Sequence, residues 1–192
     1  MGGRGGSSGG GGGGGATIQG KDFVSFPPTA LNKQGERVVT LTDDGQYMYS
    51  RAIPNFSEST IDTKSTEYKR ALRDYNVKAQ FNADGSVSAA KGGLFSRKQK
   101  FKNINDFQNE ANKRIDNQVN RWKSEESRVK SGRLTQIEAE NIRLTVRNNT
   151  PSMALKDIHK GFKEQITTSR TYVKAGEDMK RRLNRAINNA RK

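Results

Sequence analysis

The stretch from Asn105 to Lys130, which contains neither glycine nor proline, most constrains the fold of this chain. Apolar residues recur within it at steps of 4, 4, 4, 3 and 7, a spacing that places them on one face of a helix. These residues are Phe107, Ala111, Ile115, Val119, Trp122 and Val129. Asn105 is a suitable N-cap, and Gly132 a suitable stop. The sequence therefore predicts a long amphipathic helix, with Trp122 as its core anchor.

The chain beyond this stretch is also expected to be helical. Thr135 and Glu138 form a capping-box pattern that opens a helix reaching about Asn148. Thr150 and Pro151 fit the cap and first position of a second helix. A last helix is expected through "EDMKRRLNRAINNARK", and its apolar face consists of Met179, Leu183, Ala186, Ile187 and Ala190. Residues 105–192 thus form one predicted helical unit.

The segments 136–148 and 151–161 have the outline of a DNA-reading helix-turn-helix. The connection "RNNTP" lacks the glycine that is usual in that turn. A plain pair of antiparallel helices is therefore the favoured interpretation.

Residues 17–90 have a different pattern, which predicts a small α+β unit. β-favouring residues flank Asp43-Asp44-Gly45 in one segment and Asp84-Gly85 in another. An Asp-Gly step supports the positive φ that hairpin turns require. Between the two expected hairpins, "STEYKRALRDY" has the apolar spacing of a helix. The expected fold class is α+β, with hairpins preceding a helical, basic C-terminal half.

Residues 1–16 contain eleven glycines and one charged side chain, Arg4. Glycine loses much backbone freedom on ordering and buries no side-chain area in return. A disordered tail is therefore expected. The single "RGG" at Arg4-Gly5-Gly6 differs from the repeated units of RNA-binding tails. "GATIQGK" matches most of a phosphate-binding loop, but Asp22 stands where that loop needs a hydroxyl residue.

Deleting residues 1–16 is expected to leave the melting temperature nearly unchanged, because this segment has almost no side-chain area to bury. Thermal unfolding of the full and shortened chains, followed by circular dichroism, measures the difference. A clear drop in the shortened chain would contradict a disordered tail.

The net charge of +15 is unevenly distributed. Residues 17–90 carry nine basic and nine acidic side chains, whereas residues 91–105 carry five basic side chains and no acidic one. Residues 156–192 carry eleven basic and four acidic side chains. Twelve of the fifteen excess charges therefore lie in the last two segments. Such clustering favours a polyanionic partner, through Coulomb attraction and counterion release. The alternative is a basic surface that has no partner.

Few residues suggest catalysis. The chain has no cysteine, which excludes thiolate metal sites and fits a reducing compartment. His159 is the single histidine, and we expect it near a helix end, where a cation is favourable. Asp43-Asp44 lacks the full calcium-loop pattern. The sequence thus favours a protein that is not an enzyme and has no cofactor or metal. It also has no segment apolar enough for a membrane span or a secretory signal.

The first residues, "MGGRGGSSGG", resemble the Met-Gly-Gly-Arg-Gly-Ser-like head of a loose group of small proteins encoded by phages and prophages. The resemblance covers about ten residues of low complexity. It implies a phage or mobile-element protein, in the host cytoplasm or the virion. It implies no fold and no functional residue.

These observations favour a phage-type protein that binds DNA or RNA through phosphate contacts, with a role in packaging or inside the virion. The expected domains are a tail at 1–16, an α+β unit at 17–90, a basic linker at 91–104 and a helical unit at 105–192. The expected nucleic-acid-binding residues are Lys91, Arg97, Lys98, Lys100, Lys102, Lys180, Arg181, Arg182, Arg185, Arg191 and Lys192. The alternative is a protein-interaction module, either a virion component or an inhibitor of a host nucleoprotein or defence complex.

Overall fold

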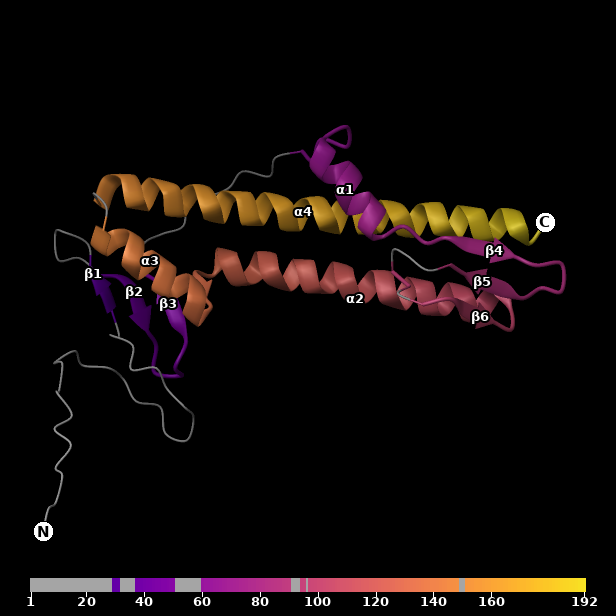
Figure 1. Cartoon of the computed structure of the whole chain (residues 1–192), viewed down its shortest axis with the longest axis horizontal. Helices are drawn as coiled ribbons and strands as arrows, with labels where there is room; N and C mark the ends of the chain where they lie inside the picture. Colours follow the sequence, from indigo (N-terminus) through magenta and orange to yellow (C-terminus); the bar gives the residue numbers. More distant parts are fainter. Residues whose placement is uncertain (1–28, 32–36, 51–59, 91–93, 96, 149–150) are drawn as a thin grey trace, which may run out of the picture. The chain divides into compact units, whose positions relative to one another are not determined.

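A computed structural model describes residues 29–31, 37–50, 60–90, 94–95, 97–148 and 151–192 (Figure 1). The chain has an α+β fold with two small antiparallel sheets and a helical C-terminal half. The expected tail at 1–16 and Lys91 lie outside the described residues. The chain divides into two units, each formed from two separated segments: 1–52 with 132–158, and 53–131 with 159–192. Each of the two expected folded domains, 17–90 and 105–192, therefore contributes residues to both units.

The first unit contains a four-stranded sheet, in the order β1-β2-β3-β7. Its strands are β1 (Thr29–Leu31), β2 (Arg37–Leu41), β3 (Tyr47–Tyr49) and β7 (Arg133–Leu134). The β2–β3 turn confirms the first expected hairpin, since Gly45 has a φ of 77° there. Gly132 also has a positive φ, of 71°. A Cβ at Gly132 would lie 3.3 Å from the Tyr49 carbonyl oxygen, which leaves little room for a side chain.

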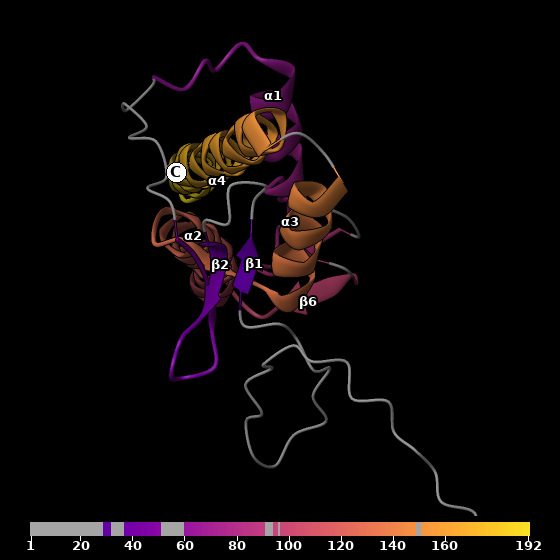
Figure 2. The same ribbon diagram turned by 90° about the vertical axis from the view of Figure 1, so that its left-hand side faces the viewer.

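Helix α3 (Gln136–Asn148) packs against the strands of this sheet (Figure 2). The capping box forms as expected: the Thr135 amide donates to Glu138 Oε2 at 2.8 Å, and the Glu138 amide donates to Thr135 Oγ1 at 3.3 Å. Ala139, Ile142 and Val146 form the buried face of the helix. Their spacing of three and four residues explains why α3 covers the sheet with one face.

The second unit contains a three-stranded sheet, in the order β4-β5-β6, and three helices. The strands are β4 (Ala79–Phe81), β5 (Val87–Ala89) and β6 (Gln99–Phe101). Gly85 has a φ of 77° in the β4–β5 turn, which confirms the second expected hairpin. β6 lies inside the segment 91–104, so part of the expected basic linker is a strand of this sheet.

The helices of this unit are α1 (Thr66–Asp74), α2 (Ile104–Lys130) and the part of α4 (Pro151–Ala190) that follows residue 158. Ser65 caps α1, and its Oγ accepts a hydrogen bond from the Tyr68 amide. Asn103 caps α2, two residues before the expected cap at Asn105. Asn103 takes this role because its side-chain oxygen accepts from the Asp106 amide at 2.9 Å.

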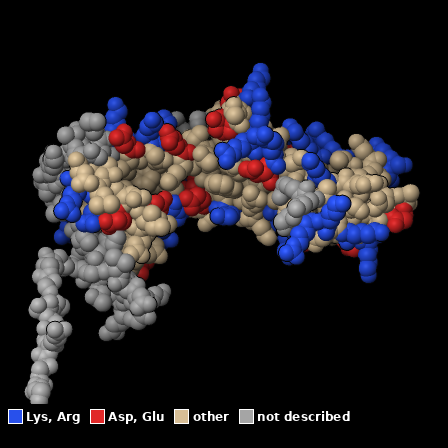
Figure 3. All heavy atoms as spheres, in the orientation of Figure 1, with Lys and Arg blue, Asp and Glu red and all other residues tan. Residues whose placement is uncertain are grey.

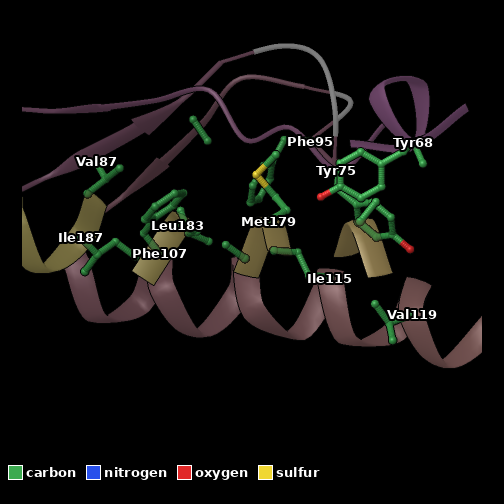
Figure 4. Packing of buried hydrophobic residues seen from close by; sticks show 14 residues of the cluster. Tyr68, Tyr75, Val87, Phe95, Phe107, Ile115, Val119, Met179, Leu183 and Ile187 are labelled. Atoms are coloured by element: carbon green, nitrogen blue, oxygen red, sulfur yellow. The ribbon is translucent and has the colours of Figure 1, made fainter. Parts of the chain in front are cut away.

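One continuous core joins the sheet to α1, α2 and α4. Figure 4 shows side chains of α2 and α4 turned toward one another, with Met179 beside Phe95. Phe107 has no exposed surface and lies 5.4–6.2 Å, between ring centroids, from three other phenylalanines. These are Phe81, Phe95 and Phe101. Aromatic burial of this extent stabilises a core made from few apolar residues.

Trp122 is not the core anchor that the helical pattern predicted. It lies at the edge of the core, half-buried, and its ring stacks on Tyr172 with centroids 4.3 Å apart. Fully buried aromatic rings lie elsewhere, at Tyr75, Phe95 and Phe107. The pattern identified the correct helix face, because its other members, from Phe107 to Val129, are buried, but Trp122 lies at the edge of the core.

The expectation of two helices after Thr150 was also wrong, because α4 continues unbroken through Gly161 and Gly176. His159 therefore lies within a helix and not near its end. A helical glycine costs only about 1 kcal/mol relative to alanine, which packing of the surrounding turns can offset. Gly176 is buried where α4 approaches Val119 and Tyr75.

Candidate nucleic-acid interface

The β4-β5-β6 sheet has one apolar and one polar face, because successive side chains of a strand point to opposite sides. Phe81, Val87 and Phe101 are paired across the three strands and join the core. The neighbouring row consists of Gln80, Ser88 and Lys100, and alternation places it on the outer face.

A second row of outward-facing residues, Lys78, Ala90 and Lys98, lies next to the first on the outer face of the sheet. The Ala90 amide donates to the Lys78 carbonyl oxygen at 2.7 Å, so these residues face each other beyond the strand ends. Lys98 lies two residues before Lys100 on the β6 side, which gives it the same orientation. The outer face thus carries lysines on both outer strands.

The outer face is hollowed into a groove of about 810 Å³. Its lining includes three lysines and no acidic residue. The lining residues are Val77, Lys78, Ala79, Gln80, Ser88, Ala89, Ala90, Lys98, Gln99 and Lys100. We call this the sheet groove. Its volume lies within the range of small-molecule and cofactor sites, and its charge suits an anionic ligand.

One carboxylate lies beside the sheet groove. Asp84, in the β4–β5 turn, is 4.0 Å from Lys100 Nζ, and both side chains are largely exposed. A hydrogen bond from the Ser86 hydroxyl lowers the pKa of Asp84, and the Ser86 amide and Lys100 add to this effect. Asp84 is therefore charged at neutral pH, but an exposed pair of this length holds Lys100 only weakly.

The segment that carries Arg97 and Lys98 is anchored on both sides. Phe95 is fully buried, and the Arg114 guanidinium carbon lies 4.5 Å from its ring centroid. Arg114 also donates to the Leu94 carbonyl oxygen at 3.3 Å and to Gln99 Oε1 at 3.2 Å. These contacts hold the segment against α2 and leave Arg97 and Lys98 exposed.

The expected cations of α4 divide into two groups. Lys180, Arg181 and Arg191 are engaged within the protein. Lys180 Nζ donates to both carboxylate oxygens of Asp116, at 2.7 and 2.8 Å. Arg181 pairs with Asp178, and Arg191 donates to the side-chain oxygens of two α2 residues, Asn105 and Gln108.

Asp178 shows why these contacts are structural. Burial opposes its ionisation, but hydrogen bonds from Tyr68 and Arg181 outweigh burial and lower its pKa. The Tyr68 hydroxyl donates to Asp178 at 2.6 Å, and burial together with this bond raises the pKa of Tyr68 to about 12. Asp178 thus ties α1 to α4, and Arg181 neutralises it.

The second group remains available to a partner. Arg182, Arg185 and Lys192 are exposed, and no acidic partner is found for them among the described residues. Arg182 and Arg185 are three residues apart, which places them on one side of α4, and Lys192 follows the end of the helix. The same holds for Arg97, Lys98 and Lys102 beside the sheet, which are exposed and without a carboxylate partner in the described part of the chain.

The two free groups lie at one end of the second unit. Leu183 and Ile187, which alternate with the free arginines of α4, belong to the same core cluster as Val87 and Phe95. Figure 3 shows Lys and Arg gathered over this end of the unit, near the C-terminus of α4. The structure thus places, at one end of this unit, two groups of cations that lie about eighty residues apart in the sequence.

Lys78 is a member of the groove that charge counting missed, because it belongs to a segment with no net charge. The alternation of Val77, Ala79 and Phe81 predicted a strand, and the same alternation places Lys78 on its polar face. That signal was present in the sequence.

Within the described part of the chain, no group of three or more His, Cys, Asp or Glu side chains could hold a metal ion. Nor does any helix there have the length and apolar character of a membrane span. No family of known proteins, no curated protein and no solved structure matches this chain.

Proposed function

We propose that this protein binds nucleic acid through phosphate contacts, using the sheet groove and the free cations of α4. One observation carries the proposal: a groove lined by three lysines and no acidic residue lies at the end of the unit where Arg182, Arg185 and Lys192 are exposed. A cationic groove of this kind attracts a polyanion and releases its counterions.

The arrangement favours phosphate contacts over base recognition. Both phenylalanines of the sheet, Phe81 and Phe101, point into the core, so the described outer face offers no aromatic ring for base stacking. Phosphate contacts fix a protein on nucleic acid without reading sequence. Binding with strong salt dependence and little sequence preference is therefore proposed.

The double variant Arg182→Glu/Arg185→Glu is expected to weaken binding at least tenfold near 0.1 M salt, because two phosphate contacts become repulsions. Neither residue has an acidic partner among the described residues, so the fold is expected to persist. The measurement is fluorescence anisotropy with two unrelated DNA sequences and one RNA across a salt series. Lys180 is unsuitable for this test, because a glutamate there would face Asp116.

The matched control is Arg121→Glu/Lys163→Glu, which changes the net charge equally at two other exposed cations. Lys163 lies nineteen residues before Arg182 on α4, about 28 Å along the helix. The control is expected to bind nearly as the parent protein does. Equal loss in both variants, or no binding by the parent at low salt, would contradict the proposal.

The setting of this activity is proposed from the N-terminal resemblance alone. We place it in a phage protein that acts in the virion, during packaging or in the host cytoplasm. Packaged genomes and defence nucleoproteins both present dense phosphate charge, which suits a basic protein that does not read sequence.

A protein-interaction module is the second candidate function, and α3 carries the observation that favours it. Ile137 is 74% exposed and Leu144 is 39% exposed. They lie seven residues apart, on one side of the helix. Co-purification of a partner that is lost in Ile137→Ser/Leu144→Ser, together with no binding of bare nucleic acid, would favour this candidate over the first.

A further inference from the structure

We propose that the sheet groove holds the backbone of a single polynucleotide strand and discriminates against duplex. This inference rests on the proposed function and names its substrate class. It follows from the size, charge and hydrogen-bonding character of the side chains on the outer face of the β4-β5-β6 sheet.

The cross-section of the groove is set by side-chain length. The middle strand presents Ser88 and Ala90, which are short, whereas the outer strands present lysine and glutamine. The outer residues are Lys78, Gln80, Lys98 and Lys100. The face is therefore low along β5 and high along β4 and β6, so that it forms a trough along the strand direction.

The trough is narrow. Its two sides are separated by two interstrand spacings, about 9.5 Å from β4 to β6. One sugar–phosphate backbone can lie along such a trough. A duplex backbone winds around its axis once in about 34–36 Å and would leave a straight trough after a short arc. A single strand can follow the trough, so it makes more contacts with both sides.

The polar groups of the trough are mainly donors. Ser88 Oγ accepts a hydrogen bond from Asn82 Nδ2 at 3.3 Å, and its hydroxyl proton can still donate to an acceptor. Asn82 is itself held by Ser86, whose Oγ accepts from the same nitrogen at 2.9 Å. The lysine ammonium groups are donors only. Phosphate oxygens are acceptors only, so they can accept hydrogen bonds from Ser88 at the floor of the trough and from the lysines at its sides.

The trough also determines where the bases lie. Its described lining contains no aromatic side chain, so no ring there stacks on a base. Its two neutral amides, Gln80 and Gln99, are outnumbered by three lysines, which only donate and so favour phosphate over base edges. The backbone therefore lies in the trough and the bases face solvent. Single-stranded DNA and RNA share this chemistry, and the experiment distinguishes them.

The test is anisotropy with a labelled single strand of mixed sequence, its duplex, and an RNA of the same sequence, across a salt series. The parent is expected to bind both single strands at least tenfold more tightly than the duplex at matched salt. Lys78→Gln/Lys98→Gln is expected to reduce the log–log salt slope on single strands by about 1.4, which is about 0.7 for each lost contact.

A charge-neutral variant, Ser88→Leu, isolates the shape of the trough, because leucine raises its floor without altering net charge. It is expected to lose most of the single-strand preference while duplex binding by α4 persists. Circular dichroism and thermal unfolding establish that this variant is folded; if it is not, Ala90→Leu raises the same floor one row away.

The possible outcomes separate the two proposals. Equal binding of single strands and duplex by the parent, or an unchanged preference in the folded floor variant, overturns the single-strand inference and leaves the proposed function standing. No binding of any nucleic acid at low salt overturns the proposed function. A tenfold preference for RNA over DNA supports the inference and narrows the substrate to RNA.

Discussion

Replacing Phe107 with alanine is expected to lower the free energy of unfolding of the second unit by about 3–5 kcal/mol. Phe107 has no exposed surface, and its ring packs at 5.4 Å from Phe101, 6.0 Å from Phe81 and 6.2 Å from Phe95. These rings come from α2, both outer strands and the segment before β6. Removing the Phe107 ring from the middle of this group would leave a cavity that no single element can fill by a small shift.

Urea unfolding followed by circular dichroism measures this loss. Trp122→Ala is the control, because it removes a larger aromatic ring from the same helix, where it is half-buried. We expect the loss in the control to be less than half of the loss in Phe107→Ala. The reverse order would mean that the core is centred near Trp122, as the helical pattern alone suggested.

The local features of the fold were predictable because local chemistry determines them. Asp-Gly steps gave both hairpin turns, where Gly45 and Gly85 have the expected positive φ. The Thr135–Glu138 capping box marked the start of α3. In each case, neighbours in the sequence supply the physical cause, so no tertiary information was needed.

Tertiary packing explains what the sequence did not show. The stripe on α2 identifies a face of the helix, but the position of maximum burial depends on the elements that cover it. The three-stranded sheet covers Phe107, whereas Trp122 meets Tyr172 at the edge of the core. The two units combine separated segments for the same reason: sequence patterns mark elements but not their tertiary partners.

The candidate site was predictable in part. Charge clustering identified both basic segments, but it could not distinguish Lys180, which Asp116 holds, from Arg182, which is exposed. The distinction depends on which turn of α4 faces α2. Charge counting also missed Lys78. The acidic residues of the segment 17–90 cancel its charge in the count, although none of them lines the sheet groove.

Two glycines of α4 are expected to respond to alanine in opposite directions. At Gly161, a Cβ would meet nothing within 4 Å. Gly161→Ala is therefore expected to raise the free energy of unfolding by about 0.5–1 kcal/mol, because alanine loses less backbone entropy in a helix. At Gly176, a Cβ would lie 2.4 Å from Val119 Cγ2 and 3.0 Å from Tyr75 Cζ.

Gly176→Ala is expected to lower the free energy of unfolding by about 1–3 kcal/mol, because the overpacking exceeds the gain in helix propensity. Tyr75 has no exposed surface and Val119 is 5% exposed, so neither can move aside freely. Val119 is also β-branched, which restricts its rotamers within α2.

Both variants, Gly161→Ala and Gly176→Ala, gain the same intrinsic helix propensity, so the difference between them isolates the packing of α4 against α2 and α1. Urea unfolding followed by the fluorescence of Trp122, the single tryptophan, measures both. A rise in stability at both positions would contradict this packing, because it would mean that there is room for a Cβ between Gly176 and Val119.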